Sequence, residues 1–319
     1  MRILTFLFLF LSTSVLADVA VVTYNMAQLK KNGLDLVACT SRRASLQVDA
    51  IFKDPASPIY TSKDFILLIQ ESWTKKSFEA LKSEALKQSF TIYPNDYQNV
   101  KDTGQLIITN LRPIEIQTIP FSRDKYAKKG IIYARLSLTN NKSIGVMNVH
   151  TTYSDKMGFS DEQRTHFQEV AQAVETLKPR TDYFVVGGDF NAGPDMAYKV
   201  VNFDAVDLIW NDGMMLPMWN QEMRLLESVG VTWDETNNML VKIPPLILRL
   251  VNTYKNGYAG WDMKDSTLDH IFVPKATTVS RHEIVFDKKV KMNCGKRDDE
   301  DGLVHLSDHY GVMAVIVTK

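Results

Sequence analysis

Polar residues of metal-binding or acid-base type recur at the ends of segments that the sequence predicts to be β-strands. In chain order they are Asn25, Glu71, His150, Asp189, Asn191, Asp269, Asp308 and His309. Loops at strand ends are where a rigid scaffold usually presents functional side chains. Each residue alone has a structural explanation, as the cap of a turn, a solvated acid or an ordinary histidine. Their recurrence at successive strand ends is much harder to explain in that way, so we predict one functional site.

The residue types favour metal-assisted hydrolysis of a phosphate ester. Oxygen ligands such as those of Glu71, Asn25 and Asp308 favour a hard cation, Mg²⁺ or else Mn²⁺ or Ca²⁺, over Zn²⁺. No paired cysteines and no HExxH spacing compete with that assignment. Bound Mg²⁺ would polarise a phosphoryl oxygen. A histidine can take a proton from water while a nearby carboxylate fixes its tautomer.

The elements that must position these residues are mostly short, apolar and β-branched. Segments of this kind, bounded by turn residues, are typical of strands. They are Val19 to Thr23, Phe65 to Ile69, Leu106 to Thr109, Ile114 to Ile119, Ile131 to Leu138, Ile144 to Val149, Tyr183 to Val186, Leu268 to Val273 and Val312 to Val317. Helical patterns cover Arg43 to Lys53, Ser77 to Gln88 and Asp161 to Leu177, the last preceded by Ser160 in a capping-box pattern.

The order of these elements is mixed, which indicates an α/β protein. The turns at Leu111–Pro113 and Asn140–Lys142 are typical of hairpins, whereas other strands are separated by helices. Such a mixture favours two packed sheets with helices outside. Because the sequence has no internal repeat and no low-complexity linker, we predict one domain over residues 18–319.

The first residues are typical of a secretory signal peptide. Arg2 precedes an apolar run from Ile3 to Leu11, and small and polar residues follow up to Ala17. We therefore predict a signal peptide over residues 1–17, cleavage after Ala17 and a secreted or periplasmic protein. A retained anchor is the alternative, although the apolar run is shorter than the ~20 residues of a spanning helix.

The composition of the chain limits which kinds of molecule it can bind. The chain has 37 basic and 37 acidic residues, so it has no global cationic field, and a polyanionic substrate must be held by a local patch. Cys39 and Cys294 are compatible with one disulfide in an oxidising compartment, or with two unpaired thiols. The apolar stretch from Ile243 to Val251 is either a buried element or a loop for peripheral membrane contact. We expect a monomer.

Two motifs, Gly188-Asp189-Phe190-Asn191 and Ser307-Asp308-His309, resemble those of the endonuclease/exonuclease/phosphatase superfamily. This superfamily includes pancreatic-type deoxyribonucleases, abasic-site endonucleases, inositol-polyphosphate phosphatases and neutral sphingomyelinases. The similarity runs from Val21–Asn25 to Ser307–Gly311, nearly the whole chain after residue 17. The resemblance implies a four-layered α/β/β/α sandwich with two central mixed sheets.

The resemblance also implies roles for the metal-binding residues and the base. A divalent metal would bind Glu71, with Asn25 beside it and Asp308 close by. His309 would be the general base that activates water, and Asp269 the carboxylate that orients it.

For the remaining candidates the resemblance implies contacts with the reacting phosphate. Asp189 and Asn191 would align the nucleophile and stabilise the pentavalent transition state. His150 would contact the phosphate or assist the leaving group. In such sites positioning and electrostatics supply most of the rate gain.

The sequence leaves the substrate open. Tyr126–Ala134 resembles the Lys-Gly-containing strand of neutral sphingomyelinases and favours a phospholipid headgroup. Gly188–Ala192 is equally similar to deoxyribonucleases, so a secreted DNase- or RNase-type nuclease is the alternative. A third alternative is a catalytically inert binding protein on the same fold. Lys128, Lys129 and Arg164 could hold phosphate in the first two cases, or be solvated surface residues.

Overall fold

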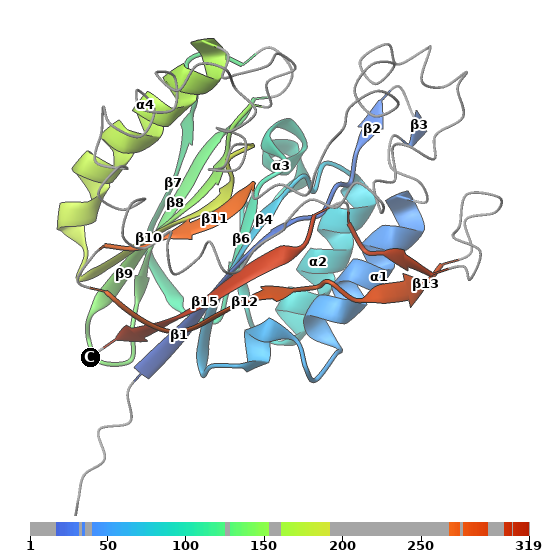
Figure 1. Ribbon diagram of the computed structural model, residues 1–319, viewed down its shortest axis with the longest axis horizontal. Coiled ribbons are helices and arrows are strands. Elements are labelled where there is room, and N and C mark those ends of the chain that lie inside the picture. The colour runs from blue at the N-terminus through green and yellow to red at the C-terminus, as the bar shows by residue number, and fades with distance from the viewer. Residues whose placement is uncertain are drawn as a thin grey trace, which may run out of the picture.

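Two sheets packed face to face form the centre of the protein, and helices cover their outer faces (Figure 1). The computed structural model describes residues 17–31, 34–35, 40–124, 128–152, 161–191, 268–274, 277–292, 303–307 and 309–318. This architecture confirms the expected α/β fold with two central mixed sheets.

The first sheet has six strands. Their spatial order is β12 (Thr278–Val285), β15 (Gly311–Thr318), β1 (Ala17–Asn25), β4 (Asp64–Gln70), β6 (Leu106–Thr109) and β5 (Thr91–Tyr93). Strands β1 and β4 are parallel, and the other neighbours in this sheet are antiparallel.

The second sheet has five strands. Their spatial order is β11 (Asp269–Phe272), β10 (Tyr183–Asp189), β9 (Ser143–His150), β8 (Gly130–Ser137) and β7 (Arg112–Pro120). Here β9 and β10 are the parallel pair. Two small antiparallel ribbons pair β2 (Lys30–Lys31) with β3 (Leu34–Asp35), and β13 (Lys289–Lys291) with β14 (Leu303–His305).

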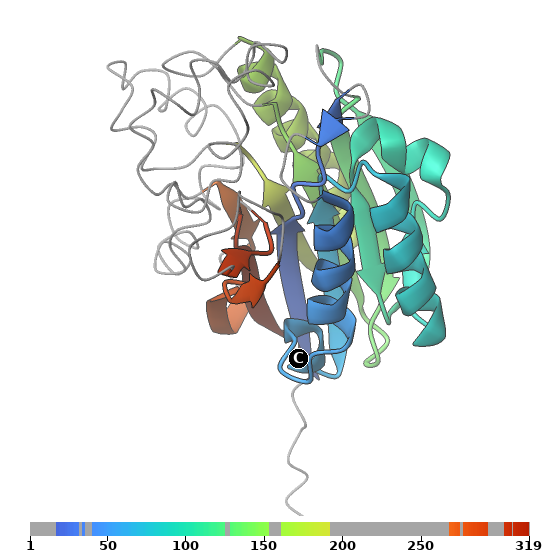
Figure 2. The same cartoon turned by 90° about the vertical axis from the view of Figure 1, so that its right-hand side faces the viewer.

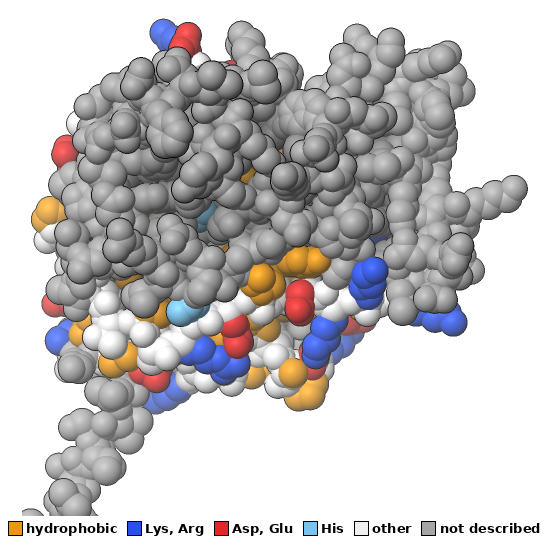
Figure 3. Space-filling view, in the orientation of Figure 1, with side chains coloured by type: hydrophobic (Ala, Val, Ile, Leu, Met, Phe, Trp, Pro, Cys, Tyr) orange, Lys and Arg blue, Asp and Glu red, His pale blue; other side chains and the backbone are white. Residues whose placement is uncertain are grey.

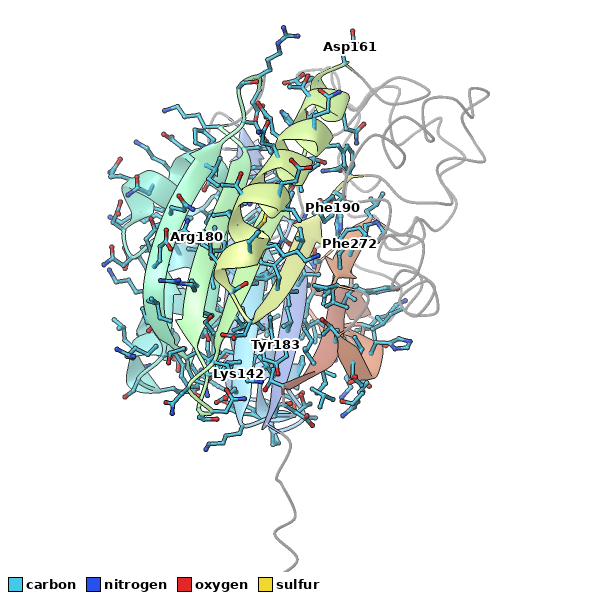
Figure 4. The ribbon with its side chains drawn as sticks, turned by 90° about the vertical axis from the view of Figure 1, so that its left-hand side faces the viewer. Lys142, Asp161, Arg180, Tyr183, Phe190 and Phe272 are labelled. Carbon is cyan, nitrogen blue, oxygen red and sulfur yellow. The ribbon has the colours of Figure 1, made fainter. Side chains whose placement is uncertain are left out.

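The helices lie on opposite sides of the sandwich. Helices α1 (Thr40–Phe52) and α2 (Lys75–Lys87) run side by side over the six-stranded sheet, next to α3 (Tyr97–Thr103) (Figure 2). Helix α4 (Asp161–Leu177) crosses the outer face of the five-stranded sheet and leads into the short turn η2 (Lys178–Arg180) (Figure 4). A second short turn, η1 (Pro58–Tyr60), precedes β4.

Alternation along the central strands produces the two cores. In β1, Val19 and Val21 point into the space between the sheets, whereas Ala20 and Val22 face α1 and α2. Side chains two residues apart share a face of a strand, so one fully apolar strand can supply both cores. That is why β1 reads as a continuous apolar run rather than an alternating one.

The topology brings the predicted site residues to one edge of the sandwich. The parallel strands β1, β4, β9 and β10 end at this edge, and their antiparallel neighbours β11 and β15 begin there. Consequently a residue after β4 and a residue before β15 lie at the same edge, although they are distant in sequence.

One predicted hairpin is confirmed and one is wrong. Asn140–Lys142 does join β8 to β9, with Ser137 opposite Ser143. Leu111–Pro113 instead carries the chain from β6 in one sheet to β7 in the other. The reason is a set of long-range bonds, because Asn110 accepts a hydrogen bond from Phe65 N at 3.0 Å and donates one to Lys63 O at 2.7 Å. These bonds bind the turn to β4, and Leu111 is buried in the core between the sheets.

Several predictions fall outside the described residues. They concern the segment 1–16, the cap at Ser160, the pair Cys39 and Cys294, and the apolar stretch Ile243–Val251. Within the described ranges, no helix combines the length and the apolar character that a membrane crossing requires. The predicted single domain over 18–319 stays a prediction.

Candidate active site

Asn25, the last residue of β1, links the two sheets at the site edge. Its side-chain nitrogen donates to Asp189 Oδ2 at 2.9 Å, and its Oδ1 accepts from Ala27 N at 2.9 Å. The side chain is fully buried. Asn25 therefore fixes β1 against β10 and holds the Asp189 carboxylate in one orientation.

Glu71 follows β4 in a left-handed conformation with φ 56°. This conformation is uncommon for a residue other than glycine, and it ends the strand. Its Oε1 lies 3.7 Å from His150 Nε2, and 14% of its side chain is exposed. Glu71 is thus a carboxylate at the mouth of a buried polar cluster.

Asp189 ends β10 and depends on the glycine before it. Gly188 has φ +148°, and a Cβ added to it would lie 1.9 Å from Val149 O. Only glycine allows β10 to approach β9 so closely, and this brings Asp189 opposite His150. Asp189 Oδ1 then accepts from Asn191 N at 2.7 Å.

Asn191 is held over the same loop. It has φ 49°, and its side-chain nitrogen donates to Thr151 O at 3.0 Å. The backbone oxygen of Asn191 in turn accepts from Gln163 of α4 at 3.1 Å. The same side-chain nitrogen lies 3.3 Å from Asp189 Oδ2, so the amide of Asn191 lies beside Asp189.

His309 and Asp269 form a buried pair. His309 Nδ1 lies 2.7 Å from Asp269 Oδ2, and side-chain exposures are 5% and 0%. Since a carboxylate only accepts, we assign the proton to Nδ1, which leaves Nε2 as the basic nitrogen. Ser307 supports the pair, because its hydroxyl donates to Asn25 O at 2.7 Å and accepts from His309 N at 3.2 Å.

His150 and Lys129 form a second buried pair. Lys129 Nζ lies 2.8 Å from His150 Nε2 and donates to Thr151 O at 2.9 Å. Burial and the Lys129 charge hold the pKa of His150 well below its usual value. Burial also lowers the pKa of Lys129, although Glu71 and Asp189 oppose that change. The pair thus places an amine donor beside the two carboxylates, with a neutral histidine accepting from it.

From the sequence alone, Lys129 is one of three candidate phosphate-binding residues, with surface solvation as the alternative. For Lys128 that alternative is correct, since it is exposed and pairs with Asp102 at 2.8 Å. For Lys129 it is wrong, because the side chain is buried in the site. Lys128 and Lys129 directly precede β8. Adjacent side chains of an extended chain point to opposite sides, so one lysine can be exposed while the next is buried. The Arg164 side chain lies outside the described residues.

A buried amide that sequence reasoning missed locks the two sheets beneath the site. Asn148 donates to Ile69 O at 2.9 Å and to Leu106 O at 2.8 Å, and accepts from Gln70 Nε2 at 2.8 Å. Gln105 adds a bond to the backbone oxygen of Asn148 at 3.0 Å. These bonds fix β9 relative to β4, and so fix the position of His150 relative to Glu71. A polar residue inside the apolar run Ile144–Val149 was the available signal.

The cluster fits a divalent cation. Glu71, His150 and Asp189 each offer an atom within 4.8 Å of the others, and so do Asp189, Asp269 and His309. Carboxylates gathered in a buried edge are costly without a compensating charge, and oxygen donors suit Mg²⁺. Of the predicted ligands, Glu71 belongs to the first of these groups, and Asn25 is linked to that group through its hydrogen bond to Asp189. Asp308, the third predicted ligand, lies outside the described residues.

Solved structures of similar shape extend over nearly the whole chain. A humanized D. rerio TDP2 aligns with TM-score 0.61 and 15% identity, covering 95% of this chain and 100% of that one. A Staphylococcus aureus beta toxin mutant with bound magnesium ions aligns with TM-score 0.59 and 19% identity, covering 94% and 99%. Sphingomyelinase C from Streptomyces griseocarneus aligns with TM-score 0.58 and 12% identity, covering 93% and 99%.

The chain has the endonuclease/exonuclease/phosphatase fold. The fold expected from the sequence is thereby confirmed. No protein-family model matches the sequence, and no curated protein matches it. Identities of this size establish the fold alone, so activity has to be argued from the site.

Proposed function

We propose that the protein is a divalent-metal-dependent phosphodiesterase of the endonuclease/exonuclease/phosphatase superfamily. The observation that carries the proposal is the convergence of a histidine–carboxylate pair with a second cluster of carboxylates, amides and a buried lysine. The pair is His309 with Asp269, and both clusters share Asp189. A general base and a site for a phosphoryl group then lie side by side.

The tautomer of His309 identifies this residue as the general base. Because His309 Nδ1–H donates a hydrogen bond to Asp269, the unprotonated Nε2 can accept a proton from a water molecule. The buried Asp269 carboxylate stabilises the imidazolium that results. Asp189 lies close to this pair, and Asn191 donates to Thr151 O, which also accepts from Lys129, so the two residues would orient that water and the phosphoryl oxygens.

The opposite side of the site would neutralise charge on the phosphoryl group. Lys129 Nζ is an amine donor in a buried environment, where electrostatic interactions are strong. His150 Nε2 accepts from Lys129 and so orients it. A cation at Glu71 and Asn25, when bound, would polarise a phosphoryl oxygen and stabilise the leaving group.

For the substrate we propose a phospholipid headgroup. The Lys129-Gly130 strand that resembles neutral sphingomyelinases lies in the site, and the fold is shared with a sphingomyelinase C and beta toxin. In Figure 3, basic and acidic side chains are interspersed among the described atoms in the lower part of the view, in keeping with the balanced charge of the chain. Export after Ala17, peripheral membrane contact through Ile243–Val251 and a monomeric state are part of the same proposal.

A secreted nuclease is the second candidate. It is supported by the similarity to a D. rerio TDP2 complexed with single strand DNA product. The same base, acids and cation would serve a nucleic acid phosphodiester. The inert binding protein is disfavoured, since each of the seven site residues that the structure describes carries its expected side chain.

The experiment is a parallel assay of the purified chain on sphingomyelin vesicles, glycerophospholipid vesicles, plasmid DNA and RNA, each with Mg²⁺ and with chelator. Phosphocholine release that chelator abolishes supports the lipid proposal. Plasmid or RNA degradation with inert vesicles selects the nuclease instead. If no substrate, including bis-p-nitrophenyl phosphate, is cleaved with any divalent metal, the enzyme proposal is wrong.

A further inference from the structure

His166 in α4 is a buried histidine that the proposed chemistry does not use. Its Nδ1 accepts a hydrogen bond from Thr152 N at 3.1 Å, and its Nε2 bonds to Arg123 O. A backbone N–H only donates and a backbone carbonyl only accepts. The ring is therefore neutral and carries its proton on Nε2. Burial lowers the pKa of His166, in agreement with a neutral ring.

The two partners of His166 belong to the two segments that hold Lys129. Asp124, next to Arg123, accepts from Lys129 N at 2.7 Å. Thr151, next to Thr152, accepts from Lys129 Nζ at 2.9 Å. His166 thus joins the segment that fixes the backbone of Lys129 to the segment that fixes its amine.

The plane of the His166 ring is also fixed. The ring of Phe121 stacks on it, with centroids 4.0 Å apart and planes 15° apart. A ring held on one face and at both nitrogens has one orientation. This arrangement is more specific than the packing of an apolar core residue, which would need neither hydrogen bond.

We propose that His166 is a positioning residue that sets the place of Lys129, and through it of His150, in the site. The inference rests on the proposed function for its kinetic part. Without His166, the Thr152 N–H and the Arg123 carbonyl lose their shared partner, and the two segments can separate. Displacement of a catalytic group by about 1 Å can cost about 100-fold in rate.

The kinetic test compares His166→Ala with a matched control on the same helix, Val174→Ala. Both side chains are fully buried, but Val174 packs only in the core, away from the site. At a temperature where all variants are folded, His166→Ala should lower kcat/KM for bis-p-nitrophenyl phosphate by about 10- to 100-fold. Val174→Ala should lower Tm but leave kcat/KM within about twofold, since it removes packing alone.

A double-mutant cycle separates positioning from general destabilisation. If His166 acts through Lys129, then Lys129→Met combined with His166→Ala should lose no more activity than Lys129→Met alone. Fully additive losses, or equal kinetic losses in His166→Ala and Val174→Ala, would overturn the proposal.

A spectroscopic readout does not depend on activity. In ¹⁵N-histidine-labelled wild-type protein, His166 should show an unprotonated Nδ1 and a protonated Nε2 at neutral pH. The His150 ring signals should shift in His166→Ala and stay in place in Val174→Ala. A charged or Nδ1-protonated His166, or unmoved His150 signals, would overturn the proposal even if the wild type cleaved no phosphodiester. Absence of turnover with the expected spectra would instead reject only the proposed function.

Discussion

The buried pair of His309 and Asp269 makes Asp269→Asn the sharpest single change in the site. Asparagine has the shape of aspartate but lacks its charge. The 2.7 Å contact to His309 Nδ1 can therefore remain, but the charge that stabilises a protonated His309 is lost. Neither side chain is more than 5% exposed, so solvent cannot replace that charge.

The size of the effect follows from the type of bond. A hydrogen bond to a charged group contributes about 1.5–3 kcal/mol. Since each ~1.36 kcal/mol is tenfold in rate, kcat/KM should fall by about 13- to 160-fold if His309 keeps its tautomer. If the new amide instead donates to Nδ1, the proton of His309 moves to Nε2 and the basic nitrogen is lost. The decrease in kcat/KM should then approach about 10⁴-fold, as for a catalytic-triad histidine held in the wrong tautomer.

The assay is turnover of bis-p-nitrophenyl phosphate with saturating Mg²⁺, alongside the ¹⁵N spectrum of His309. The spectrum decides which of the two magnitudes applies. Asp64→Asn is a matched control, because Asp64 is also a buried carboxylate but lies at the opposite end of β4. If Asp269→Asn keeps kcat/KM within about threefold of wild type, His309 is not the base that Asp269 supports.

Three further changes test other parts of the account. Lys129→Met should lower kcat by about 100- to 1,000-fold, as for loss of an oxyanion-stabilising donor, and should also lower Tm, because Glu71 and Asp189 lose the nearby positive charge; a normal kcat in this variant would contradict the role of Lys129. Gly188→Ala should destabilise by about 3 kcal/mol or more, because its Cβ would clash with Val149 O and its φ is strained; chemical unfolding measures it, and a change below about 1 kcal/mol would refute the close-approach argument. Burial raises the pKa of Asp64 in the folded protein. Protonated Asp64 therefore contributes its full stabilisation of the fold below the unfolded-state pKa, and that contribution is lost as pH rises through the folded-state pKa. Asp64→Asn should therefore raise Tm at pH 7 and leave it unchanged near pH 3, and the same Tm difference at both pH values would refute the sign.

The fold could be predicted largely because its central strands are almost fully buried. Segments such as Phe65–Ile69 and Ile144–Val149 are apolar on both faces, and their lengths favour strands over helices. Which strands pair with one another was harder to predict from the sequence. The turn at Leu111–Pro113 looks like a hairpin by composition, but long-range bonds from Asn110 to β4 decide its path.

The site was predictable where a residue type and a strand end coincide. Asp189, Asp269 and His309 meet both conditions, and the structure brings them within 4.8 Å. Lys129 adjoins the start of β8 but does not meet the condition of residue type, because lysine is usually a surface residue. His166 lies on a helix, where a histidine inside an amphipathic pattern gives no indication of its contacts. Its significance depends on two loops that only tertiary structure brings to α4.

The most direct measurement of the central claim is the Mg²⁺ dependence of wild type and Glu71→Gln, followed by both turnover and Tm. For wild type, turnover of bis-p-nitrophenyl phosphate should saturate with Mg²⁺ and vanish with chelator. Mg²⁺ at ten times its Kd should stabilise the fold by about 1.4 kcal/mol. Glu71→Gln should lose most of both responses, because the partly exposed carboxylate at the mouth of the cluster is gone. Equal turnover with and without chelator, or an unchanged Mg²⁺ response in Glu71→Gln, would contradict a metal-dependent site at this edge of the sandwich.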